Sequence, residues 1–275
     1  MSKLLSAGFL RLKKSKVFFI LAGFMFAFGS YMSVSGYMDM KKYQFTHTLE
    51  DVFFTQVMLT GIVTAVFCSL FIGTEYSDGT IRNKLIVGHS RISIYISNLI
   101  VCMAAGIAFS LSYMAACACV GIPLLGFFQM DPQTAVLLVL CSMVISIAYT
   151  SVFTLAAMLI HSKAVLSVVS VITAFLLMFA ATYLYASLSQ PEMVSDYVIN
   201  ESGEVTQSKP APNPFYLTGT KRKVHEFLLE FLPSGQTFLI INRTPFSAHI
   251  FLYDGLIFIC AAGIGLSAFL KKDIK

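Results

Sequence analysis

The sequence predicts an all-α integral membrane protein with six transmembrane helices. Of its residues 57% are hydrophobic and only 12% are charged, whereas about 25% of residues are charged in ordinary soluble domains. Its mean hydropathy is +0.78. The apolar residues also occur in long runs, and a helix needs about 20 such residues to cross a hydrocarbon core roughly 30 Å thick.

Six apolar runs are long enough to span a membrane, and together they make the chain a single transmembrane domain, residues 1–275. The predicted spans cover residues 17–37, 52–73, 93–121, 134–160, 164–188 and 251–270. Polar residues 74–92 separate the second span from the third, and residues 189–248 separate the fifth from the sixth.

The basic residues predict the orientation of these spans. Residues 1–16, 74–92, 161–163 and 271–275 hold 12 Lys and Arg residues but 3 acids, while the rest of the chain holds 7 Lys and Arg residues and 11 acids. Short cytoplasmic segments are enriched in Lys and Arg. We therefore expect both termini in the cytoplasm, and residues 189–248 outside a cell (plasma) membrane. The net charge of +5 then indicates attraction to a membrane surface and no nucleic-acid partner.

The first 16 residues predict an interfacial helix that precedes the first span. "MSKLLSAGFLRLKKSK" alternates apolar and basic residues, so its cations can face lipid headgroups while the apolar residues form one stripe. That stripe contains Leu4, Leu5, Phe9, Leu10 and Leu12. The alternative is a signal peptide cleaved near Ala27–Gly29, but the apolar run continues past that point.

Motifs for catalysis or nucleotide binding are missing from the sequence. It contains no Gly-x-x-x-x-Gly-Lys-Ser/Thr phosphate loop and no Gly-x-Ser-x-Gly motif. "HEFLL" begins like a His-Glu-x-x-His zinc motif, but Leu229 stands where the second histidine belongs. We therefore expect no enzyme activity, no metal site and no bound cofactor on this chain.

Charged residues are nearly absent from the predicted spans. Asp254, about one turn inside the outer end of the sixth span, is the one exception. An acid that reaches the headgroups is the simpler interpretation, and a functional intramembrane acid is the alternative. An ion-coupled transporter would usually show more buried acids and broken helices, so the energy for any transport should come from another subunit.

The densest polar cluster of the chain is "FIGTEYSDGTIRNKLIVGHSR", residues 71–91. We expect Glu75 near the start of a short helix, a turn at Gly79, and Thr80 as the cap of the following turn. In "IRNKL", Ile81 and Leu85 would share one face four residues apart.

This amphipathic segment could dock into a groove on a soluble partner. The alternative is an ordinary positive-inside loop with an internal pair between Glu75 and Arg82. The sequence of the segment leaves both readings open.

The long segment before the sixth span has two parts. "QPEMVSDYVINESGEVTQSKPAPNP" is acidic and rich in proline, which predicts an exposed irregular loop. "GTKRKVHEFLLEFLPSG" has apolar residues at helical spacing, which predicts an amphipathic helix that ends before Pro233. Its apolar face would contain Val224, Phe227, Leu228, Phe231 and Leu232.

Several motifs together carry a family resemblance. "GTEYSDGTIRNKLIVGHSR" after a second span, "FLPSGQ" in the outer segment and the ending "FLKKDIK", with Phe269 and Asp273 four residues apart, resemble the permease subunit of a bacterial type-2 ABC exporter. Small Gram-positive permeases that export bacteriocins or related peptides are the nearest in this resemblance.

The resemblance implies partners and a site. A coupling helix within residues 74–92 would contact a separate ABC ATPase subunit, which would hold ATP and Mg. A second permease, identical or a sister chain, would complete a dimer in the lipid membrane. The residues that match the family's coupling motif are Glu75, Tyr76, Gly79, Thr80, Ile81, Arg82, Asn83, Lys84 and Leu85.

The function that we expect is ATP-driven export. The apolar spans suit an amphipathic or hydrophobic cargo such as a peptide, a lipid or a drug. The alternative is a membrane-embedded sensor or assembly protein that recruits a cytosolic partner through residues 74–92.

Overall fold

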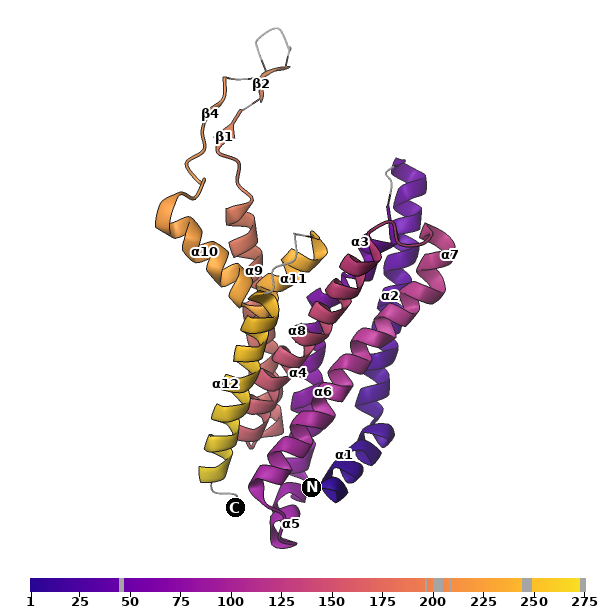
Figure 1. Ribbon diagram of the computed structural model, residues 1–275, viewed down its shortest axis with the longest axis vertical. Helices are drawn as coiled ribbons and strands as arrows, with labels where there is room; N and C mark the ends of the chain where they lie inside the picture. Colours follow the sequence, from indigo (N-terminus) through magenta and orange to yellow (C-terminus); the bar gives the residue numbers. More distant parts are fainter. Residues whose placement is uncertain (45–46, 196, 200–204, 208, 244–248, 273–275) are drawn as a thin grey trace.

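The chain folds into a bundle of long helices with a projecting, partly β-structured arm (Figure 1). The structure is a computed structural model that describes residues 1–44, 47–195, 197–199, 205–207, 209–243 and 249–272. Within these residues, six helical segments are long and apolar enough to cross a membrane. The prediction of a six-helix membrane protein is therefore confirmed.

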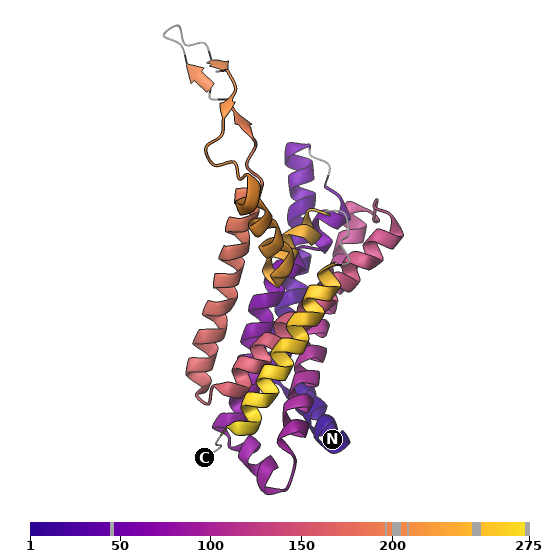
Figure 2. The same cartoon turned by 60° about the vertical axis from the view of Figure 1, so that its left-hand side comes forward.

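The helical elements follow the chain in a simple order. They are α1 (Ser2–Lys14), α2 (Lys16–Tyr43), α3 (Leu49–Phe53), α4 (Gln56–Ser77), α5 (Thr80–Ile86), α6 (Arg91–Ala116), the π-helix η1 (Cys117–Gly121), α7 (Ile122–Leu125), α8 (Pro132–Leu159), α9 (Lys163–Leu188), α10 (Gly219–Phe231), α11 (Pro233–Ile241) and α12 (His249–Lys271). Both chain ends and α5 lie at one end of the bundle, and α3, α7 and α10 lie at the other (Figures 1 and 2).

Helix α4 forms the centre of the bundle. It packs against α2, α6, α8 and α9, and 67% of the apolar window in its span is buried. The corresponding share is only 22% for α9 and for α12, and 17% for α2. The outer faces of these three helices are therefore suited to contact lipid or another chain.

Polar side chains fix where several of the long helices begin. Ser15 Oγ accepts a hydrogen bond from Phe18 N at 3.3 Å, and Asp131 Oδ2 accepts one from Thr134 N at 3.2 Å. Ser90 and Ser162 cap α6 and α9 in the same way. Such caps satisfy backbone N–H groups that have no partner inside the helix. Short polar stretches of the sequence thus become helix boundaries.

The arm between α9 and α10 differs from the predicted irregular loop. Strand β1 (Met193–Val194) pairs antiparallel with β4 (Ala211–Pro212), and β2 (Tyr197–Ile199) pairs antiparallel with β3 (Val205–Gln207). The prediction of an irregular loop was wrong here because strand pairing satisfies the backbone groups of a segment that is too polar to pack in a core. The fold is therefore all-α apart from these short ladders.

Close helix crossings depend on residues without side chains. Gly265 on α12 faces Tyr95 on α6, and a Cβ atom at this glycine would overlap the Tyr95 hydroxyl. Tyr95 is buried and donates a hydrogen bond to Ala261 O at 3.5 Å. The tyrosine thus occupies the space that the glycine leaves.

Substitution of Gly265 by valine should therefore loosen the contact between α12 and α6. Overpacking typically costs about 1–3 kcal/mol, so the purified protein should unfold at a lower temperature. Gly263→Val is the matched control, because no atom lies within 4 Å of a Cβ at Gly263 on the same helix. Equal thermal stability of the two variants would contradict this account.

Candidate functional site

The buried carboxylate of Glu75 joins four helices near the end of the bundle that holds both termini. Its side chain is 4% exposed. Glu75 accepts hydrogen bonds from Arg11 on α1, from Lys84 Nζ on α5 at 2.5 Å, and from Asn98 Nδ2 on α6 at 2.9 Å. We call Arg11, Glu75, Lys84 and Asn98 the Glu75 cluster. Its one acid is matched by two cations and an amide donor.

Arg11 fixes α1 against the central helix. It also donates a hydrogen bond from Nη2 to Phe71 O at 2.9 Å, and its guanidinium lies 3.6 Å from the centre of the Phe71 ring. Burial lowers the pKa of Arg11, and the attraction to Glu75 partly offsets this shift. Leu4 and Leu12 of the predicted apolar stripe are buried, while Leu10 is exposed. Contacts with the rest of the protein therefore hold helix α1, while its exposed apolar residue suits the membrane interface.

Glu75 does not lie where the sequence placed it. It belongs to the last turn of α4, which continues to Ser77, and its partners are Arg11 and Lys84. Arg82 is exposed, so the pair between Glu75 and Arg82 that the alternative interpretation contained is not formed. The helix can continue past the apolar run because the cluster compensates the charge of Glu75.

The turn that follows α4 depends on a glycine and a threonine. Gly79 adopts φ 66°, a left-handed conformation that glycine enters without steric cost. Thr80 Oγ1 donates a hydrogen bond to the backbone oxygen of Glu75 at 3.0 Å. Thr80 therefore closes the end of α4, and the prediction that it caps the next helix is wrong.

A second cluster, next to the first, holds the end of α12. Tyr76 Oη donates a hydrogen bond to Met158 O at 2.6 Å, and Lys272 Nζ donates to Tyr76 Oη at 3.0 Å and to Met158 O at 2.7 Å. The His161 ring stacks on Tyr76 with a centroid distance of 5.3 Å. We call Tyr76, Met158, His161 and Lys272 the Tyr76 cluster. It connects α4 and α8 to the end of α12.

Arg91 provides a further connection to the same helix end. It donates hydrogen bonds to Phe269 O at 2.9 Å and to Leu270 O at 3.3 Å, and it also bonds Lys272 O. Carbonyl groups in the last turn of a helix lack partners inside the helix. Arg91, the first residue of α6, therefore caps the C-terminal end of α12. Asp273, which belongs to the family-like ending, lies outside the described residues.

Burial alters the charges of the Tyr76 cluster. It lowers the pKa of Lys272 to about 8. Burial and the nearby Lys272 also lower the pKa of His161. Lys272 donates hydrogen bonds to two oxygen atoms, a geometry that both its charged and its neutral form can keep.

The outward surface of α5 is not the one that its spacing predicts. Ile81 is 1% exposed and Leu85 packs against the core. Ile86 and Val87 are instead 73% and 76% exposed. We define the α5 surface as Arg82, Asn83, Ile86 and Val87. The sequence analysis did not select Ile86 and Val87, although two consecutive apolar residues in front of Gly88 in a polar segment were a usable signal.

A cavity of about 190 Å³ lies beside the α5 surface. Its lining combines the end of α4, the turn at Gly79, and the loop between α8 and α9. Side chains that line it include Tyr76, Ser77, Arg82 and His161. The protein surface therefore has a hollow next to the exposed side chain of Arg82.

The predicted amphipathic helix is α10, and its apolar face is only partly covered. Phe227 and Phe231 pack around Tyr253 of α12, with ring centroids 6.0 and 5.7 Å apart. Val224 and Phe227 remain about half exposed. Of the other predicted residues, Leu228 is half-buried and Leu232 follows the helix end. Leu229, which the sequence pattern did not select, is the buried residue of α10.

Within the described residues, no group of three His, Cys, Asp or Glu side chains could hold a metal ion. A family model described as "ABC-2 family transporter protein" matches residues 4–181. This range includes most of α1, the α4 residues Glu75 and Tyr76 of the two clusters, and the α5 surface. No curated protein matches the chain.

Removal of the charge of Glu75 should destabilise the end of the bundle that holds both termini. Loss of one partner of a buried charge pair typically costs about 3–5 kcal/mol, so Glu75→Ala should markedly lower the thermal stability of the purified protein. Asp78→Ala is the control, because Asp78 is an exposed acid three residues away. Similar stability of both variants would show that the Glu75 cluster contributes little.

The lowered pKa of Lys272 predicts a pH effect on stability. Between about pH 8 and pH 10.5, the unfolded chain binds more protons at this residue than the folded chain. The free energy of unfolding should therefore rise with pH in this window relative to that of Lys272→Met, which cannot titrate. Thermal unfolding of both proteins across this range measures the difference, and parallel curves would contradict the assignment.

Proposed function

Since the chain belongs to the ABC-2 transporter family, we propose that it is the permease of an exporter driven by a separate ATPase subunit. Membership of the family makes the chain a multi-pass membrane component of an ABC transporter. We further propose that the direction of transport is export, that a separate ATPase is the partner, and that the cargo is of the class described below.

The exposed apolar pair on the α5 surface is the observation that carries the proposal. Ile86 and Val87 are exposed at the C-terminal end of α5, and α5 lies at the same end of the bundle as both termini (Figure 1). Arg82 and Asn83 lie beside them on α5. This short helix begins after Gly79, whose backbone adopts the left-handed conformation. Exposed apolar residues with a polar rim mark interaction sites. In our proposal the α5 surface docks on the ATPase.

The Glu75 cluster gives this surface a mechanical connection to the core. Lys84 belongs to α5, and its partner Glu75 belongs to the central helix α4. Arg11 and Asn98 extend the same contact to α1 and α6. When the ATPase changes state, a force on α5 would reach three other helices through one carboxylate. A transition between two packings of those helices would then alternate access to the cargo path.

The orientation and setting are part of the same proposal. The α5 surface and both termini face the cytoplasm of a bacterial cell, and residues 189–248 lie outside the plasma membrane. A second permease, identical or a sister chain, packs against the exposed helix faces, and lipid covers the remainder. ATP and Mg bind to the ATPase subunit.

The cargo that we propose is amphipathic or hydrophobic, such as a bacteriocin-like peptide, a lipid or a drug. Exposed apolar faces of α2, α9 and α12, together with the half-covered face of α10, support this class. The alternative function is a sensor or assembly protein that uses the same α5 surface to recruit another cytosolic partner. The identity of the captured protein distinguishes the two.

The docking prediction is tested with Val87→Asp. An exposed side chain tolerates this change in the folded permease, but the acid would introduce a charge into an apolar interface. We expect capture of the co-expressed ATPase and cargo export to fall at least about tenfold, the equivalent of 1.4 kcal/mol of binding free energy. Abundance of the permease in the membrane should stay unchanged.

Val224→Asp is the matched control, because Val224 is also exposed but lies on α10 at the opposite end of the bundle. It should retain ATPase capture. If Val87→Asp captures the ATPase as well as this control does, the α5 surface is not the docking site. Capture through α5 also requires that this end faces the cytoplasm.

A further inference from the structure

Asp254 lies buried in the bundle without a hydrogen-bond partner. It belongs to the second turn of α12 and is 1% exposed. Neither Oδ1 nor Oδ2 accepts a hydrogen bond from any described residue. The expectation that this acid reaches the headgroups is therefore wrong, because α12 turns it toward the protein. Buried polar groups of this kind usually have partners.

Gln236 and Tyr149 lie near this carboxylate, and Ser234 lies beside Tyr149. Gln236 of α11 lies next to Asp254; its Nε2 donates a hydrogen bond to Glu230 O at 2.9 Å, while its Oε1 has no partner. Ser234 Oγ is also unpaired and lies beside Tyr149 of α8. We call Tyr149, Ser234, Gln236 and Asp254 the outer polar cluster. Its unpaired oxygens can all accept hydrogen bonds.

No basic residue compensates Asp254 within the described part of the chain, where none of the ion pairs includes it. Cys141 and Tyr149 on α8 interact with Asp254 electrostatically. Tyr95 on α6, Glu230 on α10, and His249 and Tyr253 on α12 itself are further titratable groups on the packed elements. The cations Lys221, Arg222 and Lys223 and His225 lie in the first two turns of α10. His249 Nδ1 lies 4.0 Å from Glu230 Oε2, so this histidine faces another acid.

An ionised carboxylate with no positive charge nearby is very costly in an apolar environment. We propose that the outer polar cluster binds one positive charge, carried by a hydrogen-bond donor, at Asp254. The charge is a proton that enters from water, and binding of the ammonium group of an amphipathic amine in its place is the other outcome that the test distinguishes.

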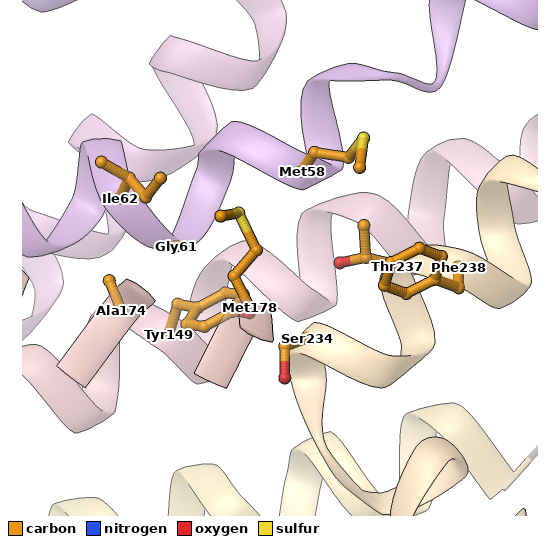
Figure 3. A pocket seen from close by; sticks show the side chains of 9 residues that line it. All are labelled: Met58, Gly61, Ile62, Tyr149, Ala174, Met178, Ser234, Thr237 and Phe238. Carbon is orange, nitrogen blue, oxygen red and sulfur yellow. The ribbon is translucent and has the colours of Figure 1, made fainter. Parts of the chain in front are cut away.

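A small cavity next to the cluster gives water a place. It has a volume of about 10 Å³ and is lined by Ser234 and Tyr149, with side chains of α4 and α9 on its other sides (Figure 3). This is room for about one water molecule. The apolar part of the lining includes Met58, Ile62, Met178 and Phe238. The cavity therefore reaches the cluster at Ser234 and Tyr149, and its lining does not include Asp254.

The test uses the purified, full-length permease in lipid nanodiscs and the hydrophobic reagent dicyclohexylcarbodiimide, which adds to protonated carboxyl groups in apolar surroundings. Peptide mass mapping locates the adduct. If a proton is bound, labelling of Asp254 should fall as the pH rises from mildly acidic to mildly alkaline. If an ammonium group binds, octylammonium should protect Asp254 from labelling at constant pH. Glu75 is the internal control and should stay unlabelled, because Arg11 and Lys84 already compensate it.

A second measurement does not depend on access of the reagent. Binding to the folded state stabilises it, so the melting temperature of the wild type relative to Asp254→Asn should fall with rising pH or increase with octylammonium. Asp254→Leu removes the acceptor oxygens and should resemble Asp254→Asn in lacking both responses. The proposal is overturned if Asp254 stays unlabelled and neither variable changes the difference in melting temperature. These readouts need no ATPase, so they are independent of the proposed function.

Discussion

Compensation of a buried carboxylate is the constraint on which the site end of this bundle depends. An unpaired charge at Glu75 would cost several kcal/mol in its buried position. Arg11, Lys84 and Asn98 remove that cost only if α1, α5 and α6 each keep their places around α4. The same contacts that make Glu75 tolerable therefore fix the geometry of four helices. The contacts of Glu75 therefore both position these four helices and stabilise their packing.

This constraint explains why a short, exposed helix can be held firmly. Helix α5 has seven residues, too few to be stable by itself in water. Ile81 anchors it in the core, and Lys84 ties it to Glu75. The outward side is then left free to present Ile86 and Val87, which no contact within the bundle requires. A docking surface needs side chains that are exposed to the partner and a backbone that the rest of the protein holds rigidly.

The sequence predicted the features that depend on local composition and missed those that depend on contacts across the chain. Six spans follow from runs of apolar residues, and the turn at Gly79 follows from the conformational freedom of glycine. By contrast, Arg11 and Glu75 are 64 positions apart, so no local pattern could pair them. The spacing of Ile81 and Leu85 indicated one face correctly, but only packing against the bundle decides that this face points inward. For Asp254, its position near a helix end suggested solvent access, whereas α12 packs closely on α8 there and the Gln236 side chain of α11 lies next to the carboxylate.

The two ends of helix α12 differ in whether their polar groups have hydrogen-bond partners. At one end, Arg91 and Lys272 bind carbonyl oxygens, so donors are matched by acceptors. Near the other end, Asp254 presents acceptors that no described donor meets. At a rise of about 1.5 Å per residue, the 17 steps from Asp254 to Lys271 span about 26 Å of continuous helix. The Tyr76 cluster, which borders the α5 surface, and the outer polar cluster therefore share one rigid element. A rigid element can carry coupling between distant sites when it has two arrangements that both sites bias. A change of charge at Asp254 that alters the packing of α12 on α8 would act on the same helix whose C-terminal end contacts Tyr76 and Met158 through Lys272.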